Sequence, residues 1–151
     1  MSVLVQIGLG SSLLVLCLLM HLSVQVWVVR KLRAKKAHLH RPSGRAVFLT
    51  CSAVVLVLLF SHTAHLYIWA LSLWLLGALP GHEEPIYFSL VTYTTVGYGD
   101  VTLGPAFRIF GAMASVTGIL AFGLTTAFLV GLFPNVITTL RDDPHDPSST
   151  T

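Results

Sequence analysis

Three long apolar stretches constrain this chain more than any other feature of its sequence. They cover residues 3–29, 46–79 and 105–133, and each exceeds the roughly 20 residues that a helix needs to cross the hydrocarbon core of a bilayer. The composition agrees, because 54% of the 151 residues are hydrophobic, only 10% are charged, and the mean hydropathy is +0.80. The sequence therefore predicts an all-α membrane protein with three transmembrane helices.

The basic residues predict how these helices are oriented. Seven of the nine Lys and Arg residues fall within residues 30–45, between the first two stretches: Arg30, Lys31, Arg33, Lys35, Lys36, Arg41 and Arg45. By the positive-inside rule this basic connector lies in the cytoplasm of a multi-pass protein of the plasma or inner membrane, with the N-terminus outside and the C-terminus cytoplasmic. Residues 31–36 either continue the first helix or form a solvated topology signal.

The first stretch, residues 1–29, is expected to stay as a membrane anchor rather than to be removed as a signal peptide, because its basic residues follow it. The net charge of +3 lies beside the membrane, so anionic lipid is the expected partner and nucleic acid is not. Cys17 and Cys51 are expected to be small buried residues without a disulfide. Residues 134–151 are expected to form a largely disordered cytoplasmic tail.

The most informative motif lies between the second and third stretches, where residues 94–100 read Thr-Thr-Val-Gly-Tyr-Gly-Asp. Gly97 and Gly99 can take the positive φ that a residue with a Cβ adopts only at a steric cost. With positive φ at every second residue, successive backbone carbonyls turn toward one axis, where they can replace the water around a cation. A tight turn is the alternative for this segment taken alone. The amphipathic run before it, residues 85–94, favours the ion-coordinating ribbon.

With this motif, residues 46–133 resemble bacterial two-helix potassium channels and the pore domains of voltage-gated ones. The resemblance implies four parts, which are an outer helix (46–79), a pore helix (85–94), a selectivity filter (95–99) and an inner helix (105–133). It also implies a homotetramer around one axis. The filter would consist of Thr95, Val96, Gly97, Tyr98 and Gly99, with K⁺ bound at the first four. The permeant K⁺ is the only expected ligand; no cofactor and no catalysis are implied.

The third stretch also resembles the inner helix of that family, from Gly118 through residue 127. Gly118 matches the position at which that helix bends during gating. Ile119, Phe122 and Thr126 match its cavity-lining positions and share one helical face. Generic close packing of transmembrane helices is the alternative role for the small residues of this stretch.

Acidic and aromatic residues flank the filter. Glu83 and Glu84 complement the positive end of the pore helix and, with Asp100, are expected to ring the outer mouth and to concentrate cations. Solvation of a turn is the alternative for the two glutamates. Some bacterial relatives carry a glutamate behind the filter, bound to the following aspartate, where this sequence has Val91. Tyr87 is therefore expected to reach Asp100 instead.

Two histidines of the second stretch leave two interpretations open. His62 and His65 lie mid-membrane and three apart, on one helical face, where they could sense protons or a metal. The favoured alternative is that they are neutral and hydrogen-bonded to a neighbouring helix, with Ser11 and Ser12 at a matching depth. His21 gives no comparable signal.

The function predicted from the sequence is passive, potassium-selective conduction. A poorly selective cation channel and a non-conducting structural or regulatory subunit of a larger transporter are the alternatives. A histidine-based metal transporter is disfavoured, because the third stretch offers no further ligands. No stretch carries arginine at every third position, as a voltage sensor would. The gating stimulus and the role of the first helix do not follow from the sequence.

Overall fold

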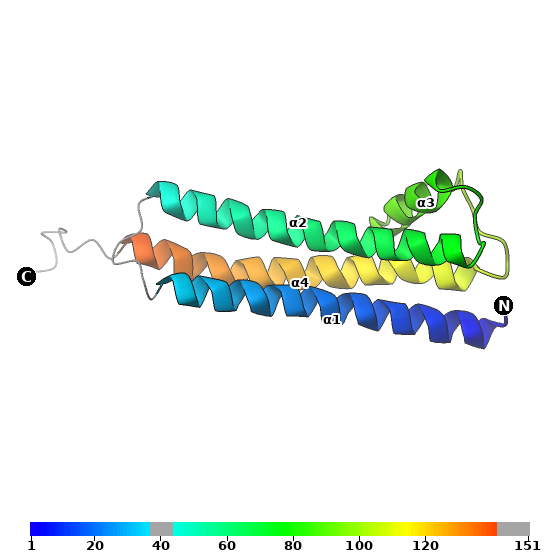
Figure 1. The fold of residues 1–151 in the computed structure, drawn as a ribbon, viewed down its shortest axis with the longest axis horizontal. Helices are drawn as coiled ribbons and strands as arrows, with labels where there is room; N and C mark the ends of the chain where they lie inside the picture. The colour runs from blue at the N-terminus through cyan, green and yellow to red at the C-terminus, as the bar shows by residue number, and fades with distance from the viewer. Residues whose placement is uncertain (37–43, 142–151) are drawn as a thin grey trace, which may run out of the picture.

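The computed structural model describes residues 1–36 and 44–141. This part of the chain contains four helices and no strand, as predicted: α1 (Val3–Lys36), α2 (Gly44–Leu75), α3 (Glu83–Tyr93) and α4 (Arg108–Arg141). The helices α1, α2 and α4 run side by side, and the short α3 lies at one end of them (Figure 1). Three apolar spans are long enough to cross a membrane, which confirms the predicted number: Val3–Ala34, Gly44–Leu75 and Arg108–Pro134.

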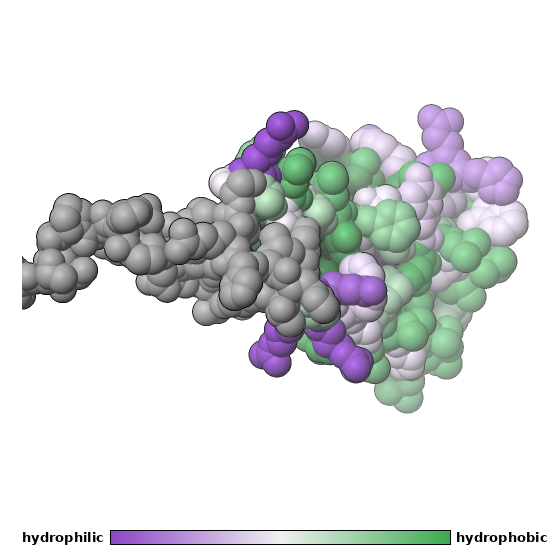
Figure 2. Space-filling view, turned by 60° about the vertical axis from the view of Figure 1, so that its left-hand side comes forward, coloured by the Kyte–Doolittle hydropathy of each residue, from purple (hydrophilic) through white to green (hydrophobic). Residues whose placement is uncertain are grey.

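The two ends of this bundle differ in what they carry. The N-terminus lies at the same end as α3, whereas the end of α1, the start of α2 and the end of α4 lie at the opposite end (Figure 1). Hydrophilic side chains gather near both ends, and the sides of the bundle are largely apolar (Figure 2). Such a distribution suits a protein whose sides contact lipid or further protein within a bilayer.

Two apolar clusters hold the helices together. The cluster near α3 joins all four helices and includes Cys17, Trp69, Leu73, Tyr93 and Phe110. A second cluster joins the long helices toward the opposite end, where Val28 of α1 packs with Val54 and Leu58 of α2. The two cysteines are free, as predicted. Cys17 is fully buried, as predicted, whereas Cys51 is only partly buried.

The helix α2 ends at Leu75, four residues before the predicted end, because Gly77 stops it. Gly77 has a φ of 63°. Its N–H donates to the carbonyl of Trp74 (3.0 Å), and the next N–H, of Ala78, donates to that of Leu73 (2.9 Å). These two bonds form a Schellman motif, in which glycine takes the left-handed position at low cost.

Both terminal helices extend beyond their predicted ends. Residues 31–36 continue α1, which settles the alternative left open for them. The helix α4 passes through Pro134 and reaches Arg141, so residues 134–141 are helical and the prediction of disorder for them is wrong. Apolar runs mark only the membrane span of a helix, and at the end of α1 Lys and Arg continue the helix readily beyond that span. The rest of the predicted connector and tail, residues 37–43 and 142–151, lies outside the described residues.

Gln6 gives the first helix a structural role that the sequence did not reveal. Its side chain is 2% exposed, and its Oε1 accepts hydrogen bonds from the backbone N–H groups of Ile109 (3.0 Å) and Phe110 (3.4 Å). Its Nε2 donates to the carbonyl of Pro105 (3.3 Å). The first N–H groups of a helix lack intrahelical partners, so this side chain of α1 caps the N-terminus of α4.

Candidate functional site

The predicted filter begins as an unusual C-terminal cap of α3. The N–H of Thr95 donates to the carbonyl of Thr92 (2.9 Å), as at the end of α2. The second bond to the helix end comes from Gly97, whose N–H donates to the carbonyl of Val91 (3.0 Å). Thr95 thus occupies the left-handed cap position that glycine usually takes, with a φ of 62°.

Positive φ then recurs at every second residue. Thr95, Gly97 and Gly99 have φ values of 62°, 54° and 80°, whereas Val96 and Tyr98 between them have negative φ. Alternation of this kind lets consecutive carbonyls face the same side, which an extended strand does not allow. The prediction for the two glycines is confirmed. Thr95 was not predicted, and a β-branched residue in this region carries about 1–3 kcal/mol of strain, which is typical of functional segments.

The glycines at 97 and 99 are required by conformation rather than by space. A Cβ added to either one would meet no other atom within 4 Å in this chain. Their positive φ alone disfavours other residues. The requirement for glycine at these two positions therefore follows from the local backbone and does not depend on which residues pack nearby.

The whole segment 94–100 is exposed in the single chain. Val96 and Tyr98 are 51% and 73% exposed, although both are large and apolar or aromatic. Contacts within one chain thus leave both side chains largely uncovered. Contacts with further copies stay a prediction.

Tyr87 reaches Asp100, as predicted. The Tyr87 hydroxyl donates to Asp100 Oδ2 at 2.5 Å, and the backbone N–H of Val101 donates to Asp100 Oδ1 at 3.0 Å. The hydrogen bond from Tyr87 lowers the pKa of the Asp100 carboxyl from its usual value, and the same bond raises the pKa of Tyr87. The filter is thereby tied to α3 at its outer end as well as at its base.

Three further residues around the predicted filter belong to α3. Glu83 and Glu84 form the first turn of α3 and are exposed. Val91 is 7% exposed, so the position held by glutamate in some relatives is an apolar contact here.

On α4, the predicted cavity face is open and the predicted hinge is tightly packed. Ile119 and Phe122 are 60% and 43% exposed, and Thr126 is also exposed. Gly118 is buried, and a Cβ added there would overlap the backbone carbonyl of Tyr93 at the end of α3. Gly118 is therefore required by space, which lets α4 approach the pore helix closely.

The predicted partners of the histidines are wrong. Ser12 donates to the carbonyl of Gly8 in its own helix (2.8 Å), not to a histidine. Instead, His62 Nδ1 and His65 Nδ1 lie 2.9 Å and 3.0 Å from the hydroxyl of Tyr93. A serine–histidine contact between α1 and α2 does exist, with the roles of the two helices reversed. His21 Nδ1 lies 2.9 Å from Ser61 Oγ.

His21, which gave no signal in the sequence, belongs to one buried hydrogen-bonded network with the other two histidines. His21 Nε2 and His62 Nε2 each lie 2.9 Å from Thr125 Oγ1 of α4. The histidine network thus joins six side chains from all four helices in the order Ser61, His21, Thr125, His62, Tyr93 and His65. The signal available in the sequence was the presence of four residue types that can each donate and accept a hydrogen bond, His, Ser, Thr and Tyr, in the segments that form the four helices.

The network has two further features. The rings of His62 and Phe122 are stacked, with centroids 4.4 Å apart and 21° between the planes. His65 Nε2 is buried and has no hydrogen-bond partner among the described residues. Within the described ranges, no group of three His, Cys, Asp or Glu side chains is placed to hold a metal ion.

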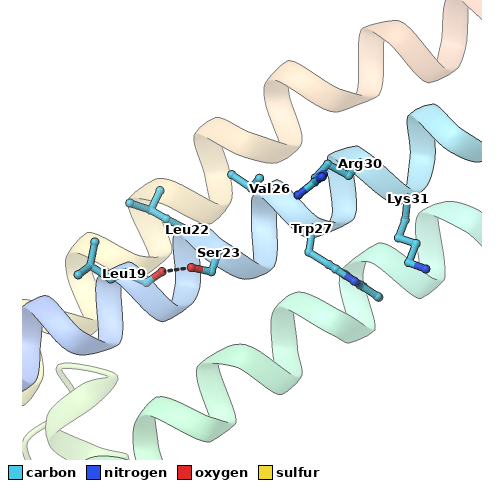
Figure 3. Close-up of a pocket in the computed structure, with 7 residues that line it drawn as sticks. All are labelled: Leu19, Leu22, Ser23, Val26, Trp27, Arg30 and Lys31. Carbon is cyan, nitrogen blue, oxygen red and sulfur yellow. Dashed lines mark hydrogen bonds between the residues drawn. The ribbon is translucent and has the colours of Figure 1, made fainter.

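A shallow groove of about 680 Å³ runs along α1 toward the basic connector. Leu19, Leu22 and Val26 line its apolar part, and Trp27, Arg30 and Lys31 lie at its end (Figure 3). Lys31 Nζ lies 5.8 Å from the centroid of the Trp27 ring, within the range of a cation–π contact.

Two membrane-spanning helices that enclose a short helix and a ribbon of alternating φ define a pore-loop membrane protein. Comparison with known families agrees, because a family model described as "Ion channel" matches residues 47–134, more than half of the chain. The chain therefore belongs to this ion-channel family, and it is a multi-pass membrane protein. No similar curated protein and no similar solved structure was found.

Proposed function

We propose that this protein is a homotetrameric channel that conducts K⁺ selectively and passively. The single observation that carries the proposal is the alternation of positive φ at Thr95, Gly97 and Gly99. It directly follows a short helix whose last residue, Tyr93, contacts the middle of the long apolar helix α2. Backbone carbonyls on one side of such a ribbon replace the hydration shell of K⁺. Thr95, Val96, Gly97 and Tyr98 would bind the ion, and no catalytic step is involved.

Four copies are proposed because one copy leaves the site incomplete. Non-helical backbone within a bilayer is tolerated only where protein buries it or where it lines a water-filled cavity. In one chain the segment 94–100 is exposed, and Val96 and Tyr98 have little to pack against. If each chain contributes one ribbon, a closed ring of chains around a common axis would bury the segment and give Val96 and Tyr98 neighbours to pack against.

The exposed face of α4 would line the cavity beneath the ribbon. Ile119, Phe122 and Thr126 lie on this face, and their exposure in one chain supports the assignment. A hinge at Gly118 stays a prediction, and its close contact with Tyr93 would couple any bend there to the end of the pore helix. Glu83, Glu84 and Asp100 would surround the outer mouth and concentrate cations.

The basic end of the bundle would face the cytoplasm and hold anionic lipid. The apolar groove on α1 suits an acyl chain, and Arg30 and Lys31 at its end suit a phosphate headgroup. Native mass spectrometry should detect retained phosphatidylglycerol in preference to phosphatidylcholine. A double variant, Arg30→Gln with Lys31→Gln, should lose this preference, and an unchanged preference would contradict the proposed site.

Reconstitution into planar bilayers with unequal K⁺ and Na⁺ tests the proposed function. A reversal potential near the K⁺ equilibrium potential is the expected result. A potential between the two equilibrium values would indicate a poorly selective cation channel. The absence of current from protein that is folded and tetrameric would indicate a non-conducting structural or regulatory subunit.

A further inference from the structure

Two hydroxyls of the histidine network each lie between two imidazole nitrogens, but each hydroxyl carries only one proton. This limits how the protons of the network can be arranged. The hydroxyl of Tyr93 lies between two imidazole nitrogens, of His62 and His65, and it can donate to only one of them. The hydroxyl of Thr125 is shared in the same way between His21 and His62. Each hydroxyl must therefore accept from one histidine and donate to the other.

The network can bind an added proton without losing a hydrogen bond only if certain histidines carry that proton. A doubly protonated imidazole needs an acceptor at both nitrogens, and only His21 and His62 have a hydroxyl oxygen at each. If His62 carries the proton, Tyr93 and Thr125 both accept from it and turn their own protons toward His65 and His21. His65 does not qualify, because its Nε2 has no partner.

Two features distinguish His62 from His21, a ring contact and a difference in exposure. The face of Phe122 stacks on the His62 ring at 4.4 Å, so an imidazolium there gains a cation–π interaction. His62 is 8% exposed, whereas His21 is fully buried. We propose that His62 is a proton-binding site within the membrane and that the Tyr93 and Thr125 hydroxyls reorient to hold the added proton.

Titratable groups face His62 from three helices. They are His21 from α1, His65 from α2 and Tyr93 from α3. From α4 the contacts are Thr125 and Phe122, which do not titrate. The described carboxylates, Glu83, Glu84 and Asp100, belong to α3 and to the segment after the filter.

The consequence for conduction rests on the proposed function. Phe122, on the face of α4 that is proposed to line the cavity, stacks on His62. A positive charge on His62 would repel K⁺ from that cavity. Acidification on the cavity side should therefore reduce the K⁺ current.

Because burial disfavours a charged imidazole, currents measured between pH 8 and pH 4 on the cavity side test the inference. The unaltered protein should lose current toward the acid end of this range. The His62→Gln variant keeps one donor and one acceptor but cannot be charged, so its current should change less than twofold. The matched control His65→Gln should keep the full response. A response that persists in His62→Gln, or no response in the unaltered protein, would overturn the proposal.

A second variant and a second readout guard against misfolding and against failure of the channel proposal. Phe122→Leu leaves every hydrogen bond of the network in place and should move the pH midpoint of inhibition about half a unit lower. Solid-state ¹⁵N NMR of histidine-labelled protein in bilayers detects the imidazolium without any current. A histidine that becomes doubly protonated in the unaltered protein but not in His62→Gln supports the site even if no K⁺ current is found. Titration of His65 alone would contradict it.

Discussion

The filter segment 94–100 and the histidine network meet at the end of α3, where Tyr93 belongs to the network and Thr94 starts the segment. The network is buried and pairs nearly all of its polar groups within one chain. The filter segment is exposed, and its main chain is tied back to α3 by only a few bonds. In the proposed channel, one chain would therefore complete the support of the pore but not the pore itself.

The glycines of the two regions make the same contrast. Gly97 and Gly99 have open space around them and positive φ, so backbone conformation dictates them. Gly118, which packs against Tyr93, has no room for a Cβ, so a neighbouring element dictates it. Substitutions at these positions should therefore fail in different ways, which separates a functional requirement from a packing requirement.

The largest effect is expected at the filter. Gly99→Ala would force a residue with a Cβ into left-handed conformation, at about 1–2 kcal/mol in each copy. We expect the K⁺ current to be lost or its selectivity over Na⁺ to collapse, as measured by the reversal potential. Gly8→Ala is the control, because a Cβ at Gly8 also meets nothing within 4 Å. Normal selectivity in Gly99→Ala would show that the alternation of φ is not needed.

A smaller effect, on stability, is expected where α4 meets α3. Gly118→Ala would push the two helices apart and lower the free energy of unfolding by about 1–3 kcal/mol. Gly123→Ala, in open space on the same helix, is the control and should be neutral or slightly stabilising. Thermal unfolding in detergent compares the two. Equal melting temperatures would argue against the close approach of Gly118 to Tyr93.

The cap that Gln6 of α1 forms on α4 should contribute somewhat less to the free energy of unfolding than the packing at Gly118 does. Gln6→Leu removes the acceptor for the N–H groups of Ile109 and Phe110, and we expect a loss of about 1–2 kcal/mol. Gln25→Leu is the matched control on the same helix, because the Nε2 of Gln25 is buried without a partner. If both variants unfold at the same temperature, the cap has no energetic role.

The smallest effect is expected at the outer end of the filter. Tyr87 holds the pKa of Asp100 below its usual value, so the bond stabilises the structure above that usual value and is lost as the pH falls through the lowered one. Tyr87→Phe should move the acid-induced loss of current, measured from the outer side, to a higher pH. Tyr67→Phe, at an exposed tyrosine of α2, should leave it unchanged. A shift in both or in neither would contradict a specific role for Tyr87.

The sequence predicts what depends on local rules. Hydropathy locates three spanning helices, and the spacing of Gly97 and Gly99 predicts the conformation of the filter. Tyr87 is placed correctly because the resemblance fixes its distance from Asp100. The end of α2 was misplaced only because the cap chemistry of Gly77 overrides the apolar run.

What the sequence does not predict depends on which helices touch. The positive φ of Thr95 follows from its place in the cap of α3, where the chain accepts strain that propensity would avoid. The roles of His21, Thr125 and Gln6 arise only when α1 packs against α2 and α4. Depth along a helix gave Ser11 and Ser12 as partners of the histidines, but depth does not determine which faces meet.

An experimental structure of the purified protein in K⁺-containing solution is the most direct test of the proposed pore. It should contain four copies around one axis, with a row of ion density coordinated by the carbonyls of Thr95, Val96, Gly97 and Tyr98. A monomer, or an assembly in which these carbonyls point away from a shared axis, would contradict the account.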